Sequence, residues 1–305
     1  MTARATGFVH SIQDRLKNEA RARNRPFSEL LELYAVERFL HRLGRSAERE
    51  RFVLKGALLL RQWLGGDTRP TRDIDLLGPV GTDAEHLHEI LRELVALGVE
   101  DDGIAFRPDT IVVAPIRRDS PIMGWRAHFD AALGRIRLRY QVDVGLGDAV
   151  FPATVEVVPG GLLGLPMASV RAYTPYTAIA EKVEAMVVLG EANSRVKDYY
   201  DVALLARSLP FDGVTLAESI RRTFARRSTP IPDGVPEGLG DSFAGAPLNG
   251  ARWKGFLGKG RLLQSERPEF ERIVAEIRRF ILPALTAARE AHSLDRSWAP
   301  GGPWR

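Results

Sequence analysis

The stretch TRDIDLLG (residues 71–78) places two carboxylates, Asp73 and Asp75, one residue apart inside an apolar run. Because side chains on a strand alternate between its two faces, Asp73 and Asp75 share one face while Ile74 points to the other. Two negative charges so close together repel each other unless a cation lies between them. A divalent metal is the simplest such cation, so this stretch predicts a strand that presents a pair of metal ligands.

A second stretch, GRIRLRYQVDVGLGD (residues 134–148), predicts a strand with one apolar and one polar face. Alternate positions are apolar from Ile136 to Val144, and Asp143 belongs to the polar set. Asp143 is therefore a candidate third metal ligand, and an ordinary strand aspartate is the alternative. Carboxylates in such a cluster suit Mg²⁺, with Mn²⁺ as the alternative, and two ions held there could bridge a triphosphate and activate an attacking hydroxyl.

A turn upstream of the acidic strand offers a place for phosphate. In FVLKGALLL (residues 52–60), Lys55, Gly56 and Ala57 form the turn between a short element and a predicted helix. A glycine at this point lets a phosphate approach the backbone, and the helix start offers unpaired N–H groups.

Two predicted helices over residues 175–208, separated near Gly190, supply further charged candidates. Lys182 lies on the first helix. On the second, Lys197 and Asp201 are four residues apart and Asp198 lies between them, so the three can share one side. A surface ion pair is the alternative interpretation of this spacing.

The order of predicted elements indicates an α+β protein, in which a mixed sheet is flanked by helices and followed by a mainly helical C-terminal lobe. Two helices are expected within residues 8–44, a helix over 82–98 that starts at Thr82, strands over 104–158, a long loop over 228–250 and a last helix near 266–292. We expect the sheet domain to span residues 1–165 and the helical lobe residues 166–305.

Composition limits the setting of the chain. Of its 305 residues, 45% are hydrophobic and 27% charged, as in ordinary globular proteins. No apolar run reaches the roughly 20 residues of a membrane span, and the polar start lacks a secretion signal, so we expect a cytoplasmic protein with no membrane partner. The absence of cysteine excludes disulfides, thiolate zinc sites and cysteine nucleophiles.

Taken together, FVLKGALLLRQWL, TRDIDLL, QVDVG, PYTAIAEKVEAMVVLG and SRVKDYYDVALLAR resemble the AbiEii/AbiGii toxin family of the nucleotidyltransferase superfamily, over about residues 25–210. The superfamily motif has Gly followed by Gly or Ser and then an Asp-x-Asp pair. Gly56 matches it, whereas Ala57 replaces the usual second residue, and the gap to Asp73 is slightly longer than typical.

The resemblance implies roles for individual residues. It implies that Asp73 and Asp75 are catalytic metal ligands, and that Lys182 contacts the triphosphate as a mobile point charge. Lys197, Asp198 and Asp201 fall in a Lys-Asp-x-x-Asp-like motif, where one aspartate is catalytically important in relatives and either could orient Lys182 or accept a proton.

Thr71 lies two residues before the acidic pair, where some relatives carry a hydroxyl that an antitoxin kinase phosphorylates. A phosphate at this position would repel nucleotide and compete for metal. A purely structural threonine in an Arg-rich turn is the alternative.

The resemblance also implies partners. Characterised relatives are toxins with a cognate antitoxin protein, and several transfer a nucleotide from a nucleoside triphosphate to the 3′ end of tRNA, which blocks translation. An aromatic and basic stretch could either bind single-stranded RNA or anchor a helix to the core; it comprises Arg252, Trp253, Lys254, Phe256, Lys259 and Arg261. Two other functions stay open: transfer to a protein or small-molecule hydroxyl, and a catalytically inactive module that binds a nucleotide or a partner.

Overall fold

The computed structural model describes residues 3–65, 68–116, 124–259 and 268–305, without the side chains of residues 3–6 and 259. These residues form two compact units, which are described separately. Unit 1 comprises residues 1–62, 70–147 and 155–172, and unit 2 comprises residues 63–69, 148–154 and 173–305. The expected α+β class is confirmed, since unit 1 is built on a mixed sheet and unit 2 is mainly helical.

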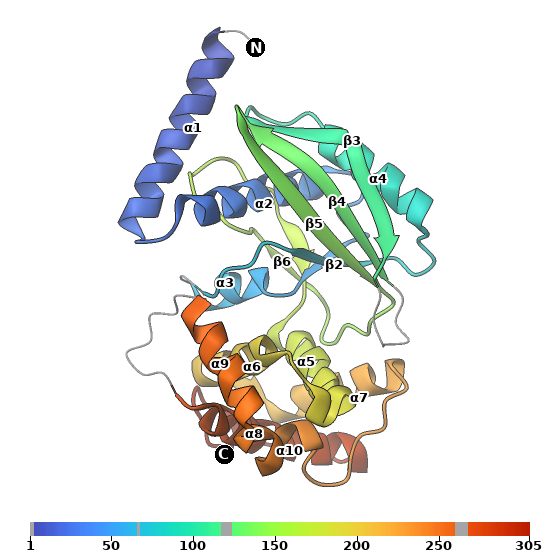
Figure 1. Cartoon of the computed structure of the whole chain (residues 1–305). Coiled ribbons are helices and arrows are strands. Elements are labelled where there is room, and N and C mark those ends of the chain that lie inside the picture. Colours follow the sequence, from blue (N-terminus) through green and yellow to red (C-terminus); the bar gives the residue numbers. More distant parts are fainter. Residues whose placement is uncertain (1–2, 66–67, 117–123, 260–267) are drawn as a thin grey trace. The chain divides into compact units, whose positions relative to one another are not determined.

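The sheet of unit 1 has seven strands in the order β3-β4-β5-β2-β1-β7-β6 (Figure 1). Its strands are β1 (Val53–Lys55), β2 (Ile74–Gly78), β3 (Ile104–Pro115), β4 (Gly124–Leu133), β5 (Ile136–Leu146), β6 (Val155–Val157) and β7 (Val170–Ala172). Most pairs are antiparallel, but β2 pairs in parallel with β5, and β1 with β7. The strand TRDIDLLG therefore lies inside the sheet, between β5 and β1.

Strand alternation gives this sheet one apolar face and one polar face. Phe129 and Tyr140 are register partners on β4 and β5, and their rings stack with centroids 5.2 Å apart. Phe39 of helix α2 (Phe27–Arg45) stacks on Phe129 at 5.8 Å, so α2 covers the apolar face. On the opposite face, Asp143 and its neighbours form the polar set that the sequence predicts.

The other helices of unit 1 are α1 (Ala3–Ala22), α3 (Leu58–Leu64) and α4 (Ala84–Ala96). The break expected between two N-terminal helices is confirmed between α1 and α2. The expected start of α4 at Thr82 is wrong, because Asp83 is the N-cap and its carboxylate accepts a 2.8 Å hydrogen bond from the His86 backbone N–H. The Thr82 hydroxyl instead donates to the Pro79 carbonyl, since the chain turns one residue later than expected.

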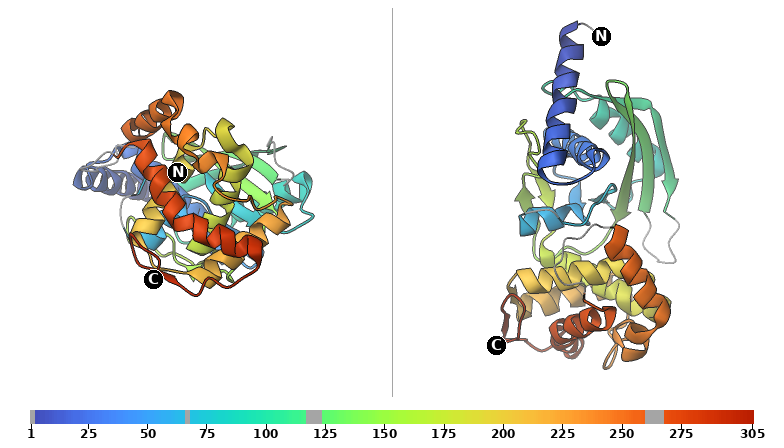
Figure 2. Two further views of the ribbon diagram at one scale, coloured as in Figure 1. Left: turned by 90° about the horizontal axis from the view of Figure 1, so that it is seen from below. Right: turned by 60° about the vertical axis from the view of Figure 1, so that its left-hand side comes forward.

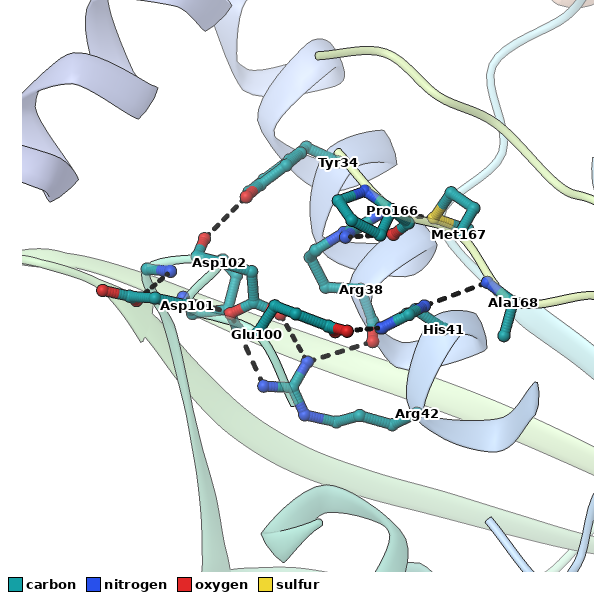
Figure 3. Close-up of polar contacts among 12 residues, drawn as sticks. Tyr34, Arg38, His41, Arg42, Glu100, Asp101, Asp102, Pro166, Met167 and Ala168 are labelled. Carbon is teal, nitrogen blue, oxygen red and sulfur yellow. Dashed lines mark hydrogen bonds and ion pairs between the residues drawn. The ribbon is translucent and has the colours of Figure 1, made fainter. Parts of the chain in front are cut away.

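A buried polar network ties α2 to the segment before β3 (Figure 3). Arg42 Nη1 lies 2.6 Å from Asp102 Oδ2, and both side chains are less than one-tenth exposed. The Asp102 carboxylate also accepts from the Ile104 N–H, while the Tyr34 hydroxyl donates to the Asp102 carbonyl at 2.6 Å. These buried hydrogen bonds and the ion pair fix how the helix lies against the segment before β3.

Unit 2 is a set of helices around α10 (Phe270–Glu290), which packs against α6 and α7 (Figure 2). Its helices before α10 are α5 (Pro175–Leu189), α6 (Val196–Ser208), α7 (Gly213–Arg226), α8 (Asp241–Gly245) and α9 (Pro247–Lys259), with short turns η1 (Gly190–Ala192) and η2 (Glu237–Leu239). Two short strands, β8 (Phe211–Asp212) and β9 (Ser297–Trp298), pair antiparallel. No helix among the described residues is long and apolar enough to cross a membrane.

The prediction of a long loop over residues 228–250 is wrong for the second half of this range. That half contains η2, α8 and the start of α9, despite its glycines and prolines. Leu239 and Phe243 are buried there, and Phe243 stacks on Tyr199 of α6 at 5.5 Å. Burial of these two side chains stabilises short helical turns that local propensity disfavours.

Replacement of Asp102 by Ala should destabilise unit 1 strongly. Arg42 would keep a buried charge without its carboxylate, which costs about 3–5 kcal/mol. The comparison is Glu100→Ala, which removes a carboxylate 56% exposed that lies 3.1 Å from His41, and which should cost much less than Asp102→Ala because water already solvates this carboxylate. Urea denaturation with hydrogen exchange of β3 amides measures both; equal losses for the two variants would contradict the assigned role of the buried pair.

Candidate active site

Four charged residues form a row across the polar face of the sheet in unit 1. Arg126 on β4 is the register partner of Asp143 on β5, Asp143 of Asp75 on β2, and Asp75 of Lys55 on β1. Register partners on adjacent strands project to the same face, and adjacent strands are about 4.8 Å apart. Two adjacent carboxylates thus lie between two cations, and the structure brings together Lys55, Asp75 and Asp143 as the sequence predicts.

Arg126 holds Asp143 by two hydrogen bonds. Its Nε and Nη2 donate to the two carboxylate oxygens at 2.8 and 2.7 Å, and Gln141 Nε2 donates to the same carboxylate at 3.3 Å. The pKa of Arg126 is raised, first by its hydrogen bond to Asp143 and then also by the charges of Asp73 and Asp75. All three aspartates therefore interact electrostatically with the Arg126 guanidinium.

Asp75 lies on β2, whereas Asp73 directly precedes this strand, which begins at Ile74. Ile74 between them is 0% exposed, whereas Asp73 is exposed and Asp75 partly exposed. Thr71, two residues earlier than Asp73, is partly exposed. The charges of both aspartates raise the pKa of Arg126, so the pair lies beside the row of charges.

Gly56 lies against the Asp75 carboxylate. A Cβ built on Gly56 would lie 2.1 Å from Asp75 Oδ2, so any side chain there would displace the carboxylate. Its φ of +77° is also one that glycine tolerates best. Ala57 follows, buried, directly before α3. The turn expected to admit phosphate is thus in contact with the acidic pair.

The donor set suits a divalent cation only in part. Asp73 and Asp75 offer hard oxygen ligands, as a Mg²⁺ site completed by water and phosphate oxygens needs, and the Gly56 backbone packs directly against the Asp75 carboxylate. Asp143 is instead occupied by Arg126. Within residues 3–65, 68–116, 124–259 and 268–305, no three His, Asp or Glu side chains converge as metal ligands.

In unit 2, Lys182 of α5 is held between two aspartates of α6. Its Nζ lies 2.8 Å from Asp198 Oδ1 and 2.8 Å from Asp201 Oδ2. Asp198 and Asp201 are 2% and 0% exposed, so both side chains face the interior. Burial lowers the pKa of Lys182, but the two carboxylates outweigh burial and raise it above its usual value, so the ammonium stays charged.

The motif on α6 is divided between two sides of the helix. Lys197 is exposed, whereas Asp198 and Asp201 bind Lys182, so the interpretation of this spacing as a surface ion pair is wrong. The four-residue spacing from Lys197 to Asp201 would allow a pair, but burial of Asp201 directs it toward α5.

Two arginines that the sequence interpretation omitted complete this cluster. Arg69 Nε and Nη2 donate to both oxygens of Asp201 at 2.7 and 2.8 Å, and Arg195 Nε lies 2.6 Å from Asp198 Oδ2. No local pattern singles out Arg69, which is 132 residues from Asp201.

Arg126, also omitted, could have been found from the sequence. The hairpin between β4 and β5 pairs Leu133 with Ile136 across the two-residue loop Gly134-Arg135. Counting back from this turn places Arg126 opposite Asp143.

The central residue of the aromatic and basic stretch on α9, Trp253, packs in the core of unit 2. Trp253 is 1% exposed and packs on Phe270, with ring centroids 5.5 Å apart, and its indole N–H donates to the Pro268 carbonyl at 2.8 Å. Trp253 therefore anchors α9 to the interior. The Lys259 side chain and Arg261 lie outside the described residues.

Comparisons with known proteins identify similar chains. The family model for the nucleotidyl transferase AbiEii toxin of type IV toxin–antitoxin systems matches residues 38–276. Among solved structures, MenT4, a nucleotidyltransferase toxin from Mycobacterium tuberculosis H37Rv, is 18% identical over 91% of this chain and 99% of its own, with a TM-score of 0.48. JHP933 from Helicobacter pylori is 14% identical over 87% of this chain and 93% of its own, with a TM-score of 0.47. No curated protein matches significantly.

Gly56→Ala should destabilise the protein by about 3 kcal/mol, from a strained positive φ together with overpacking against Asp75. Gly81→Ala is the matched control: Gly81 has φ +84° but no atom within 4 Å of its added Cβ, so only the strain of about 1 kcal/mol applies. Equal free energies of unfolding for the two variants would contradict the close approach of Gly56 to the carboxylate.

The free energy of unfolding of unit 2 should decrease at acidic pH, because the Asp198 carboxylate becomes protonated. Burial raises its pKa, but Lys182 and Arg195 outweigh burial and lower it to about 2. A lowered pKa in the folded state contributes stability above the unfolded value of about 3.9, and this stability is lost as pH falls toward 2.

Urea denaturation between pH 2 and pH 5 measures this contribution. Asp198→Asn should reduce the slope of unfolding free energy against pH by up to about 1.4 kcal/mol per pH unit, whereas Asp241→Asn, at a site 87% exposed, should leave the slope unchanged. An unchanged slope in Asp198→Asn would show that this carboxylate does not carry the acid sensitivity.

Proposed function

The chain belongs to the AbiEii family of nucleotidyl transferase toxins of type IV toxin–antitoxin systems, and we propose that it transfers a nucleoside monophosphate from a nucleoside triphosphate to the 3′ end of tRNA. The 3′-hydroxyl oxygen of the RNA attacks the α-phosphorus and forms a new phosphodiester bond. The bond between the α-phosphorus and the bridging oxygen breaks, and pyrophosphate leaves. A blocked 3′ end cannot be aminoacylated, so translation stops.

The observation that carries the proposal is the acidic pair beside Gly56, flanked by cations. Asp73 and Asp75 would hold Mg²⁺, which would neutralise phosphate charge and lower the pKa of the attacking hydroxyl. Lys55 and Arg126, on either side of the two central carboxylates, attract the polyphosphate. Because Gly56 carries no side chain, its backbone lies directly against the Asp75 carboxylate, close to the start of α3.

Arg126 gives Asp143 a role that depends on the substrate. The guanidinium binds Asp143 through two hydrogen bonds. The Arg126 side chain is 41% exposed, and a phosphate binds a guanidinium by the same fork geometry. If Arg126 turned to a bound phosphate, Asp143 would be free to serve as a third carboxylate toward a divalent cation.

For Lys182 we propose a fixed positive charge that binds the β- and γ-phosphates. Asp198 and Asp201 orient this ammonium, and Arg69 and Arg195 hold the two aspartates in turn. Asp198 and Asp201 are therefore positioning residues, and their low exposure argues against direct contact with RNA. Lys197, exposed on the same helix, contributes a weaker attraction to phosphate.

The family also supports a cognate antitoxin protein as partner, and a cytoplasmic setting in which triphosphates and tRNA are available. Thr71, partly exposed beside the acidic pair, is the hydroxyl at which a phosphate would repel the triphosphate.

Incubation with α-³²P-labelled nucleoside triphosphates and total RNA tests the function. Label should enter tRNA only with a divalent cation, and Asp75→Asn should lower the rate by about 100-fold or more, since one of two metal-binding charges is lost. Asp130→Asn, an exposed aspartate on β4, should retain the wild-type rate. Label in protein or a small molecule would move the acceptor away from RNA, and no label with any triphosphate would overturn the proposal.

A further inference from the structure

A cavity of about 730 Å³ opens in unit 2, and none of the residues assigned above lines it. It is lined by α6, α10 and the C-terminal segment: Ala203, Ala206, Arg207, Arg272, Glu276, Arg279, Trp298, Gly301, Gly302, Pro303 and Trp304. Cavities of this volume accommodate small molecules or one unit of a polymer.

The lining is electropositive. Arg272, Glu276 and Arg279 lie at i, i+4 and i+7 on α10 and so share one face of that helix. The charge of Glu276 is offset by Arg207 at 2.6 Å and by Arg272 at 3.3 Å. Arg279 is exposed and makes no ion pair with any described residue. A guanidinium without a carboxylate partner is thus available to an anion.

The cavity also has a rigid aromatic wall. The Trp304 ring lies parallel to Phe280, with an interplanar angle of 8° and centroids 5.8 Å apart, and its indole N–H donates to the Phe280 carbonyl at 3.0 Å. The Trp298 N–H donates to the Ala206 carbonyl at 2.7 Å. Because backbone carbonyls occupy both indole N–H groups, Trp304 is held as a preformed surface for stacking, at little cost in side-chain entropy.

The segment that carries these rings is fastened to the helices. Ser297 and Arg305 exchange two backbone hydrogen bonds of 2.9 Å, and the Gly301 N–H donates to the Ala206 carbonyl at the end of α6. The cavity wall is therefore part of the folded unit.

We propose that this cavity binds one nucleotide unit, its base on Trp304 and its phosphate on Arg279. A planar ring and an anion are the two features that the lining selects, and a nucleotide has both. The unit can belong to a single-stranded RNA or be a free nucleotide. An RNA strand held here would give the protein a binding surface that does not depend on transfer chemistry.

The test is binding of a 5′-fluorescein 12-nucleotide single-stranded RNA, measured by anisotropy in EDTA without triphosphate, so that failure of catalysis cannot affect it. Arg279→Gln should weaken binding roughly fivefold and reduce the magnitude of the salt slope by about 0.7, the loss of one phosphate contact. Arg278→Gln is the matched control, because Arg278 is the next residue on α10 but pairs with Asp241 at 2.7 Å and does not line the cavity.

The aromatic contact is tested separately. Trp304→Leu should weaken RNA binding about tenfold and Trp304→Phe should restore most of it, since a ring is what stacks. Competition by uridine and adenosine monophosphates distinguishes the sources: displacement of the RNA at equal phosphate concentration indicates a free-nucleotide site, and displacement only by longer strands indicates an RNA site. Equal binding by Arg279→Gln and Arg278→Gln, or no binding of either ligand by the wild type, would overturn the proposal.

Discussion

The arrangement of unit 1 depends on two like charges that the sheet forces together. Parallel pairing of β2 with β5 sets Asp75 directly beside Asp143. At strand spacing this contact is repulsive, and it persists because Lys55 and Arg126 lie at the next positions on the flanking strands β1 and β4. The row therefore has a cation at each end and two anions at its centre.

In unit 2 the charges have the opposite arrangement, with a cation between two anions. One buried ammonium lies between two carboxylates, and each carboxylate has an arginine as second partner. A single buried ion pair is a weak source of stability, but a chain in which each charge has two partners fixes side-chain positions. Both units thus use networks of charge to fix side-chain positions.

Much of this could be predicted from local pattern. Strict alternation in residues 136–144 and the Asp-Ile-Asp spacing gave the faces of β5 and β2 correctly, because a strand has only two faces. Local pattern did not locate the start of α4, because Thr82 and Asp83 are adjacent and either side chain can cap a helix. The backbone conformation of the preceding turn selects Asp83. Local pattern also could not find the helical turns near Phe243, which exist because distant aromatic rings pack on them. Partners remote in sequence, such as Arg69 for Asp201, are set by tertiary folding alone.

The two-residue turn at Gly134-Arg135 has a consequence for how this family of chains can vary. From this turn to the pair Gly124 and Gly145, every residue of β4 faces the next residue of β5 in unbroken register, without a bulge. A single inserted residue between the turn and Asp143 would rotate the acid onto the apolar face and bring Val142 into its place. Relatives that keep this chemistry should therefore tolerate length changes in the connection before β4 while conserving the length of the β4–β5 hairpin.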